Sequence, residues 1–96
     1  MASASWNGAV IAEFEGAYPS VDGNVYFPPS SLKEGFFKDS SHTSRCGYKG
    51  TANYYSIVVD GKTNANAAWV YKTPKPGMEK IAGHVAFWKG VTVTKK

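Results

Sequence analysis

The sequence predicts a mainly β domain of antiparallel strands with one or two short helices. Apolar and polar residues alternate with a period of two over much of the chain, which is typical of strands whose side chains point to opposite faces of a sheet. Asn7-Gly8 and Asp60-Gly61 each lie between apolar stretches and indicate hairpin turns. The chain has 96 residues, of which 43% are hydrophobic, and we expect them to form one small domain over residues 1–96.

The first expected element is a hairpin over residues 3–14. Its turn, Asn7-Gly8, can adopt the two positive φ angles that a type I′ turn requires. A second hairpin is expected over residues 53–72, with Asp60-Gly61 between a β-branched, aromatic strand and a strand that ends near Tyr71. A third strand pair is expected over residues 84–96, because valine and threonine alternate near its end.

Two segments favour short helices. Ser31 and Glu34 have the spacing of a capping box, which predicts a helix from about Leu32 to Phe37, although Gly35 weakens it. Residues 78–81 can form one or two helical turns that end before Gly83, a residue suited to a left-handed cap.

Residues 38–50 are polar and contain glycine, so we expect a loop there. A loop of that length in so small a domain is more often functional or mobile than incidental. We therefore expect it to close over a ligand pocket.

The single cysteine allows no intrachain disulfide and no zinc site rich in thiolates. We expect no metal and no cofactor. A reducing, cytoplasmic location is the natural interpretation, because small secreted domains usually need disulfides. The sequence has neither an evident signal peptide nor an apolar run long enough to span a membrane.

The charge is distributed unevenly along the chain. Residues 1–30 contain Glu13, Glu15 and Asp22 and no cation, so all 11 Lys and Arg residues lie in the remainder. This asymmetry favours a small-molecule ligand that is anionic. It does not favour nucleic acid, because the lysines are scattered singly and no recognition motif is present.

Cys46 and Lys49 are candidate catalytic residues. Arg45, Lys49 and His42 all lie within four residues of Cys46, and nearby positive charge stabilises a thiolate. The alternative is a half-buried structural thiol with its charged neighbours in water. Lys49 could bind a carboxylate or phosphate, or form a Schiff base if desolvated, whereas a solvated turn lysine is the ordinary explanation.

Four aromatic residues, Tyr26, Tyr54, Trp69 and Tyr71, combine an apolar body with a polar tip, and such residues cap a core or line a cleft. Tyr54 is a third catalytic candidate, and the other three are ligand-binding candidates together with His42 and Arg45. If the Asp60-Gly61 hairpin forms, Tyr54 approaches the strand that carries Trp69 and Tyr71. Core packing is the competing explanation for Trp69.

Several stretches, "WNGAVIAEF", "VYFPPSSL", "HTSRCGYKGTANYYSIVVDGK" and "NAAWVYKTPKPGMEKIAGHVAFWKGVTV", together resemble the family catalogued as domain of unknown function 427. The resemblance covers nearly the whole chain. It implies a compact, tent-like or barrel-like arrangement of antiparallel sheets. One departure is Gly47, where the family usually has proline, which frees φ beside Cys46 and restores an N–H donor. The family also carries a nucleotidyltransferase label, but this sequence has neither gathered acidic residues nor a phosphate loop.

Three classes of function remain open at this point. The first is an uncharacterised enzyme that acts on a small molecule in a pocket near Cys46 and Lys49. The second is a binding module that uses the same pocket without turnover. The third is an interaction domain that uses exposed strand edges.

Overall fold

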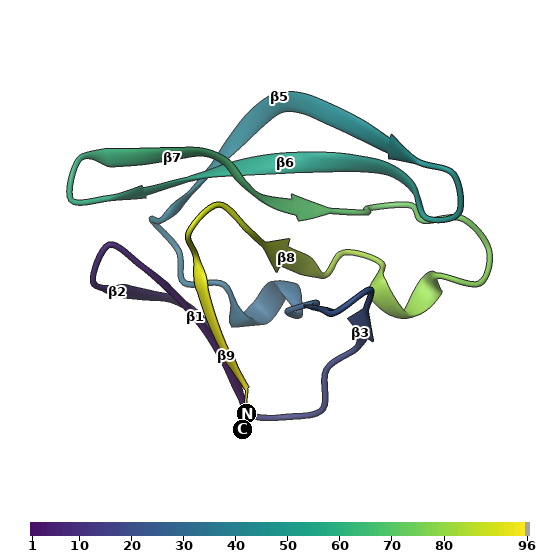
Figure 1. Cartoon of the computed structure of the whole chain (residues 1–96), viewed down its shortest axis with the longest axis horizontal. Coiled ribbons are helices and arrows are strands. Elements are labelled where there is room, and N and C mark those ends of the chain that lie inside the picture. Colours follow the sequence, from purple (N-terminus) through teal and green to yellow (C-terminus); the bar gives the residue numbers. More distant parts are fainter. Residues whose placement is uncertain (96) are drawn as a thin grey trace.

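A computed structural model describes residues 1–95, and Lys96, the end of the predicted third strand pair, lies outside the described residues. The described part is mainly β, as predicted, and its strands form three antiparallel sheets (Figure 1). These strands are β1 (Ala2–Trp6), β2 (Ala9–Phe14), β3 (Ser20–Val21), β4 (Asn24–Val25), β5 (Phe37–Cys46), β6 (Gly50–Val59), β7 (Lys62–Val70), β8 (Val85–Phe87) and β9 (Thr92–Lys95). The sheets have the strand orders β2-β1-β9, β3-β4 and β5-β6-β7-β8. Within residues 1–95 none of these sheets closes on itself, so they do not form a closed barrel.

Both predicted glycine hairpins are confirmed. Asn7 and Gly8 have φ angles of 50° and 81°, and Asp60 and Gly61 have 50° and 76°, as a type I′ turn requires. The predicted third strand pair is wrong, because β8 pairs with β7 while β9 pairs with β1 in the other sheet. Lys89 and Gly90 also have positive φ angles, and here the turn carries the chain from one sheet to another.

The loop predicted over residues 38–50 is wrong, and with it the expectation that this segment closes over a pocket. Residues 37–46 form β5, an edge strand that pairs with β6 through a short turn at residues 47–49. Most of β5 is exposed, so its polarity reflects an edge that faces water. Hydrogen bonds to β6 stabilise this strand in place of burial.

The helix predicted from Leu32 to Phe37 is also wrong. A 3₁₀ turn covers Pro29–Ser31, and the Ser31 hydroxyl donates to the carbonyl of Pro28 rather than capping a helix. Gly35 has a φ of 94°, which ends any helical path, and Phe37 already begins β5. The second helical segment is confirmed as a single 3₁₀ turn over Glu79–Ile81, followed by Gly83 at a φ of 71°.

Two irregular segments lie close together in the large sheet, β5-β6-β7-β8, on either side of the row that contains Tyr55. Between Asp39 and Thr43, β5 has more residues than the facing stretch of β6, and β7 bulges in the same way between Asn64 and Ala68. β5 is visibly bent along its length (Figure 1). Asn66, within the second bulge, has a φ of 57°, and its polar groups form hydrogen bonds with β5 and β6.

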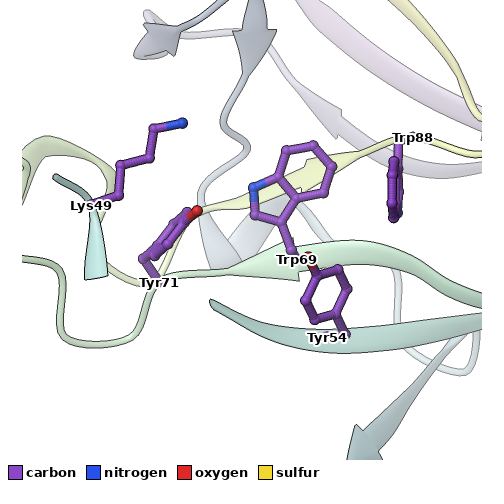
Figure 2. Close-up of a pocket in the computed structure, with 5 residues that line it drawn as sticks. All are labelled: Lys49, Tyr54, Trp69, Tyr71 and Trp88. Atoms are coloured by element: carbon purple, nitrogen blue, oxygen red, sulfur yellow. The ribbon is translucent and has the colours of Figure 1, made fainter. Parts of the chain in front are cut away.

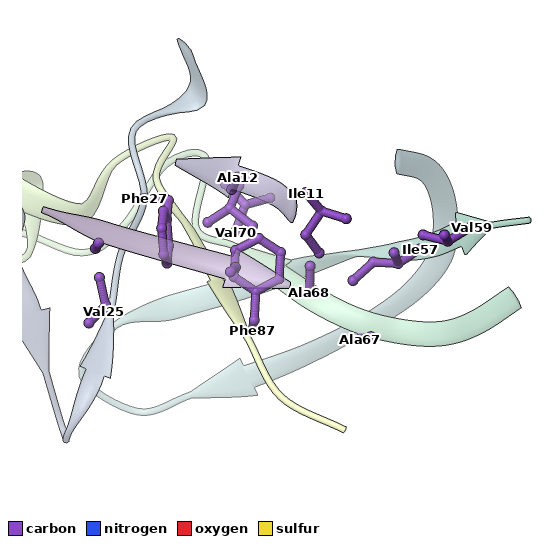
Figure 3. Packing of buried hydrophobic residues seen from close by; sticks show 13 residues of the cluster. Ile11, Ala12, Val25, Phe27, Ile57, Val59, Ala67, Ala68, Val70 and Phe87 are labelled. Atoms are coloured by element: carbon purple, nitrogen blue, oxygen red, sulfur yellow. The ribbon is translucent and has the colours of Figure 1, made fainter. Parts of the chain in front are cut away.

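The main core lies between the large sheet, β5-β6-β7-β8, and the sheet β2-β1-β9 (Figure 3). Alternate residues of β6, β7 and β8, including Ile57, Ala68 and Phe87, point into this core and meet Ile11 and Ala12 of β2. The opposite face of the large sheet packs on a second, smaller cluster around Tyr26 and Ile81. The residues on that second face are therefore available to form a surface pocket.

Candidate functional site

An aromatic pocket of about 230 Å³ opens on the face of the large sheet that points away from the main core. This aromatic pocket is lined by Lys49, Tyr54, Trp69, Tyr71 and Trp88. Figure 2 shows Lys49 and Tyr71 at one end, Trp88 at the other, and Trp69 and Tyr54 between them. The structure thus brings together four residues singled out from the sequence, and adds a fifth.

Strand pairing places the middle of the pocket. Tyr54 of β6 lies directly opposite Trp69 of β7, and Trp69 lies opposite Ala86 of β8. Residues paired in this way project from the same face of an antiparallel sheet, and here that face is opposite to the one that carries Val70 and Phe87. The alanine side chain is too small to cover the indole beside it.

Trp88 forms one wall of the pocket. It follows β8 two residues after Ala86, so alternation directs it to the same face as Trp69. The two indole rings meet edge to face, with centroids 5.9 Å apart and planes at 86°. The Trp88 Nε1 donates to the carbonyl oxygen of Asn66 at 2.6 Å, which holds the ring although its residue is 45% exposed.

Asn66 is the residue that links this wall to the bends of the sheet. The Ser40 hydroxyl donates to Asn66 Oδ1 at 2.5 Å, and Asn66 N donates to Ser56 Oγ at 3.2 Å. Asn66 of β7 is therefore hydrogen-bonded to both β5 and β6. Its left-handed backbone orients the carbonyl that Trp88 binds.

Tyr26 supports the pocket from behind and does not line it. Its side chain is fully buried, and its hydroxyl accepts a hydrogen bond from Trp69 Nε1 at 3.2 Å. The rings of Tyr26 and Trp69 pack edge to face at 6.4 Å. The expectation of core packing for Trp69 is thus correct in part, because one edge is held by the core while the residue also lines the pocket.

Lys49 is buried, with 9% of its side chain exposed, so the interpretation as a solvated turn lysine is wrong. Its Nζ lies 2.8 Å from Asp22 Oδ2, and 5.2 Å and 5.9 Å from the ring centroids of Tyr48 and Tyr71. Burial alone would lower the pKa of Lys49, but the hydrogen bond with Asp22 and the nearby Tyr26, Tyr48 and Asp22 groups raise it above its usual range. Lys49 is therefore an ammonium donor at neutral pH.

Asp22 was not identified as a site residue from the sequence. It lies on a two-residue turn between β3 and β4, with a φ of 54°, and its side chain is 54% exposed. Besides Lys49, it accepts a hydrogen bond from the Tyr48 hydroxyl. The hydrogen bonds from Lys49 and from Tyr48 lower the pKa of Asp22. Asp22-Gly23 has the pattern of a hairpin turn, but nothing in the sequence indicates which lysine it meets.

Tyr71 and Tyr54 contribute hydroxyl groups to the site. Burial raises the pKa of Tyr71, so its hydroxyl stays protonated at neutral pH. The Tyr54 hydroxyl shares a hydrogen bond of 2.9 Å with Ser44 Oγ of β5. The His42 ring packs against Tyr54 with the centroids 4.6 Å apart, so His42 borders the pocket through Tyr54.

Cys46 and Arg45 do not line the pocket. Cys46 is partly buried against the smaller cluster, and its pairing with Gly50 places it on the pocket face of the sheet. Arg45 pairs with Thr51 on the opposite face and is exposed, so alternation directs its charge away from the thiol face. The structure therefore separates the Cys46–Arg45 pair that the sequence suggested.

A second hollow of about 410 Å³ lies on the other side of the sheet, between residues 29–37 and Tyr55. Its charged residues, Lys33 and Glu34, are solvent-exposed, and Lys33 reaches Glu13 at 4.0 Å with about half of its side chain in water. The aromatic pocket differs from this hollow because its cation, Lys49, is buried.

Among the described residues, no group of three or more His, Cys, Asp or Glu side chains is arranged to hold a metal ion. Across residues 1–95, no helix is long and apolar enough to cross a bilayer. The polar atoms that the aromatic pocket offers belong to an ammonium and to tyrosine hydroxyls, which bind oxygen acceptors.

The chain is similar to one described protein family over nearly its whole length. The model of a family described as "Domain of unknown function (DUF427)" matches residues 2–95. No curated protein matches the sequence significantly.

Proposed function

The chain belongs to the DUF427 family, a domain of unknown function, and from the geometry of the aromatic pocket we propose that it binds a small planar organic molecule with an oxygen acceptor group. The aromatic side chains contact the ring of the ligand, and the acceptor oxygen receives a hydrogen bond from Lys49. The proposal rests on the buried Lys49 ammonium at one end of a pocket walled by Tyr54, Trp69 and Trp88.

The shape of the pocket supports a ring-bearing ligand. Trp69 and Trp88 meet at nearly a right angle and form a corner, so a planar ring that stacks on one indole presents its edge to the other. The volume of about 230 Å³ suits a one-ring molecule, since pockets for drug-sized ligands start at about 300 Å³.

The charges favour an oxygen acceptor over a cationic ligand. Aromatic walls attract quaternary ammonium groups in other proteins. Here Lys49 lines one end of the pocket, and Lys89 Nζ lies 5.1 Å from the Trp88 ring at the other. A cationic ligand would find Lys89 already over the Trp88 ring and no acceptor on Lys49, whereas a carbonyl or carboxylate oxygen gains a charge-assisted hydrogen bond from Lys49.

Binding without turnover agrees best with the protonation of the site. Lys49 stays protonated because it is paired with Asp22, so it is a donor and not the free amine that a Schiff base needs. Tyr71 is also a donor in its protonated form. Cys46, the candidate nucleophile, lies outside the lining of the pocket. These observations favour the binding module over the enzyme with Cys46 and Lys49 as catalytic residues.

The test is a titration of ¹⁵N-labelled protein with benzamide, followed by the indole N–H signals of the three tryptophans. Trp69 and Trp88 line the pocket, whereas Trp6 lies on β1 in the sheet β2-β1-β9 and is an internal control. We expect saturable shifts of the Trp69 and Trp88 signals and none for Trp6. Cyclohexanecarboxamide, which keeps the amide but is not planar, should bind more weakly. Equal shifts of all three signals, or none, would refute the proposal.

A further inference from the structure

Asp22 and Lys49 form an ion pair whose two members are in very different environments. Lys49 is buried beside the pocket, whereas Asp22 has 54% of its side chain in water on the tip of a turn. The distance of 2.8 Å leaves the ammonium with a carboxylate already bound to one of its three N–H groups. The pair as a whole carries no net charge.

We infer that Asp22 is the specificity-determining residue of the aromatic pocket and makes it select neutral carbonyl ligands over carboxylates. This inference rests on the proposed function and names the class of ligand. Lys49 keeps N–H groups to donate to an acceptor, so a carbonyl oxygen gains a hydrogen bond. A ligand carboxylate gains the same hydrogen bond, but it also meets the negative charge of Asp22 on the same ammonium.

The other charges near the pocket do not offset the effect of Asp22 on a ligand carboxylate. Lys75 Nζ is exposed and donates to the carbonyl of Gly47, and Lys89 Nζ donates to the carbonyl of Ala65. Both face solvent, where water and salt screen their effect on a ligand. The nearest charges to an acceptor at the Lys49 end are therefore Lys49 itself and the carboxylate that neutralises it.

The surroundings of Asp22 hold its carboxylate in place. The Tyr48 hydroxyl donates to the same oxygen that Lys49 contacts. The turn has φ angles of 54° at Asp22 and 79° at Gly23, as a type I′ turn requires. Asparagine and glycine suit the first of these positions as well as aspartate, so the charge can be removed while the turn is kept.

The experiment compares benzamide with benzoate, which have nearly the same shape and differ in charge. Dissociation constants are measured from the Trp69 and Trp88 indole signals in wild-type protein, Asp22→Asn and Asp22→Gly. The matched control is Asp60→Asn, because Asp60 occupies the same position of another type I′ turn, with a φ of 50°, at the opposite end of β6 from Lys49.

Wild-type protein should bind benzamide more tightly than benzoate. Both Asp22 variants should shift the ratio of the two constants toward benzoate by roughly three- to tenfold, the size expected for one partly screened charge, and Asp60→Asn should leave it unchanged. Binding of both probes with the same ratio in wild-type protein and Asp22→Asn would overturn the inference alone, as would a preference of wild-type protein for benzoate. If neither probe binds any of the proteins, the proposed function fails and this inference fails with it.

Discussion

Lys49 Nζ and Asp22 Oδ2 lie 2.8 Å apart, although one residue belongs to the turn before β6 and the other to the turn between β3 and β4. This contact ties the small two-stranded sheet to the large one at the end of the aromatic pocket. It also fixes Lys49 as a protonated donor.

The stability contributed by Asp22 should depend on pH. Its pKa in the folded protein is lowered, so the contribution is present above the unfolded pKa of about 3.9 and is lost as the pH falls through the folded value. Because the pKa of Lys49 is raised, the pair persists as the pH rises to the ordinary lysine value of about 10.4. Urea denaturation should show that wild-type protein is more stable than Asp22→Asn at about pH 7, and that the two have the same stability at about pH 2. A difference that grows as the pH falls would contradict this assignment.

Asn66 should be needed for its backbone conformation more than for its side chain. At a φ of 57°, alanine is strained, so Asn66→Ala should lower the free energy of unfolding by about 1–2 kcal/mol and shift the Trp88 indole signal. Asn66→Gly keeps the conformation and the carbonyl that Trp88 binds, and should leave that signal in place. Chemical denaturation of both variants measures the free energy of unfolding, and their ¹⁵N spectra report the Trp88 indole signal. Identical behaviour of the two would contradict the role of the backbone.

Gly50 should tolerate alanine poorly, whereas Gly47 should accept it. Gly50 has a φ of 113°, which side chains rarely adopt, although the space around a Cβ there would be ordinary, with Lys75 N at 3.6 Å. Gly50→Ala should therefore cost about 1–3 kcal/mol in the free energy of unfolding. Gly47 has no neighbour within 4 Å of a Cβ and no positive φ, so Gly47→Ala is the matched control and should be neutral or slightly stabilising. Thermal or urea unfolding of the two variants should separate them.

Cys46 should have no part in ligand binding. Its side chain packs against the smaller cluster and does not line the pocket, so Cys46→Ala should leave the benzamide dissociation constant unchanged. The variant should lose only about 1 kcal/mol of stability, because the thiol is partly exposed. Loss of benzamide binding in a variant that still gives a dispersed ¹⁵N spectrum would show that Cys46 belongs to the site.

Local sequence signals were sufficient for part of this structure. The two glycine hairpins followed from Asn7-Gly8 and Asp60-Gly61, because these residue pairs favour the positive φ angles of a type I′ turn. The second hairpin in turn brought Tyr54 close to Trp69. The register of its turn alone would pair Tyr54 with Ala67, and the bulge in β7 moves the pairing to Trp69. β5 was missed because an exposed edge strand lacks the apolar alternation that marks a half-buried one.

The site itself depends on contacts that no local pattern contains. Asp22 and Lys49 meet because the two-stranded sheet β3-β4 packs near one end of β6, and the sequence offers no measure of that packing. Arg45 was grouped with Cys46 because a loop was expected, and a strand separates adjacent residues onto opposite faces. Trp88 had a usable signal, since it lies two residues after Ala86 and so shares its face, but that face was not known to carry a pocket.

The most direct test of the account is the affinity of Lys49→Met for benzamide, measured from the Trp69 and Trp88 indole signals beside the same titration of Lys75→Met. Lys75 is a nearby exposed lysine that donates to a backbone carbonyl and does not line the pocket, which makes it the matched control. Loss of the charge-assisted hydrogen bond should weaken benzamide binding to Lys49→Met by about tenfold or more, while Lys75→Met binds as wild-type protein does. Equal affinity of the two variants, with both folded, would contradict the claim that the buried ammonium of Lys49 is the polar anchor of a ligand site.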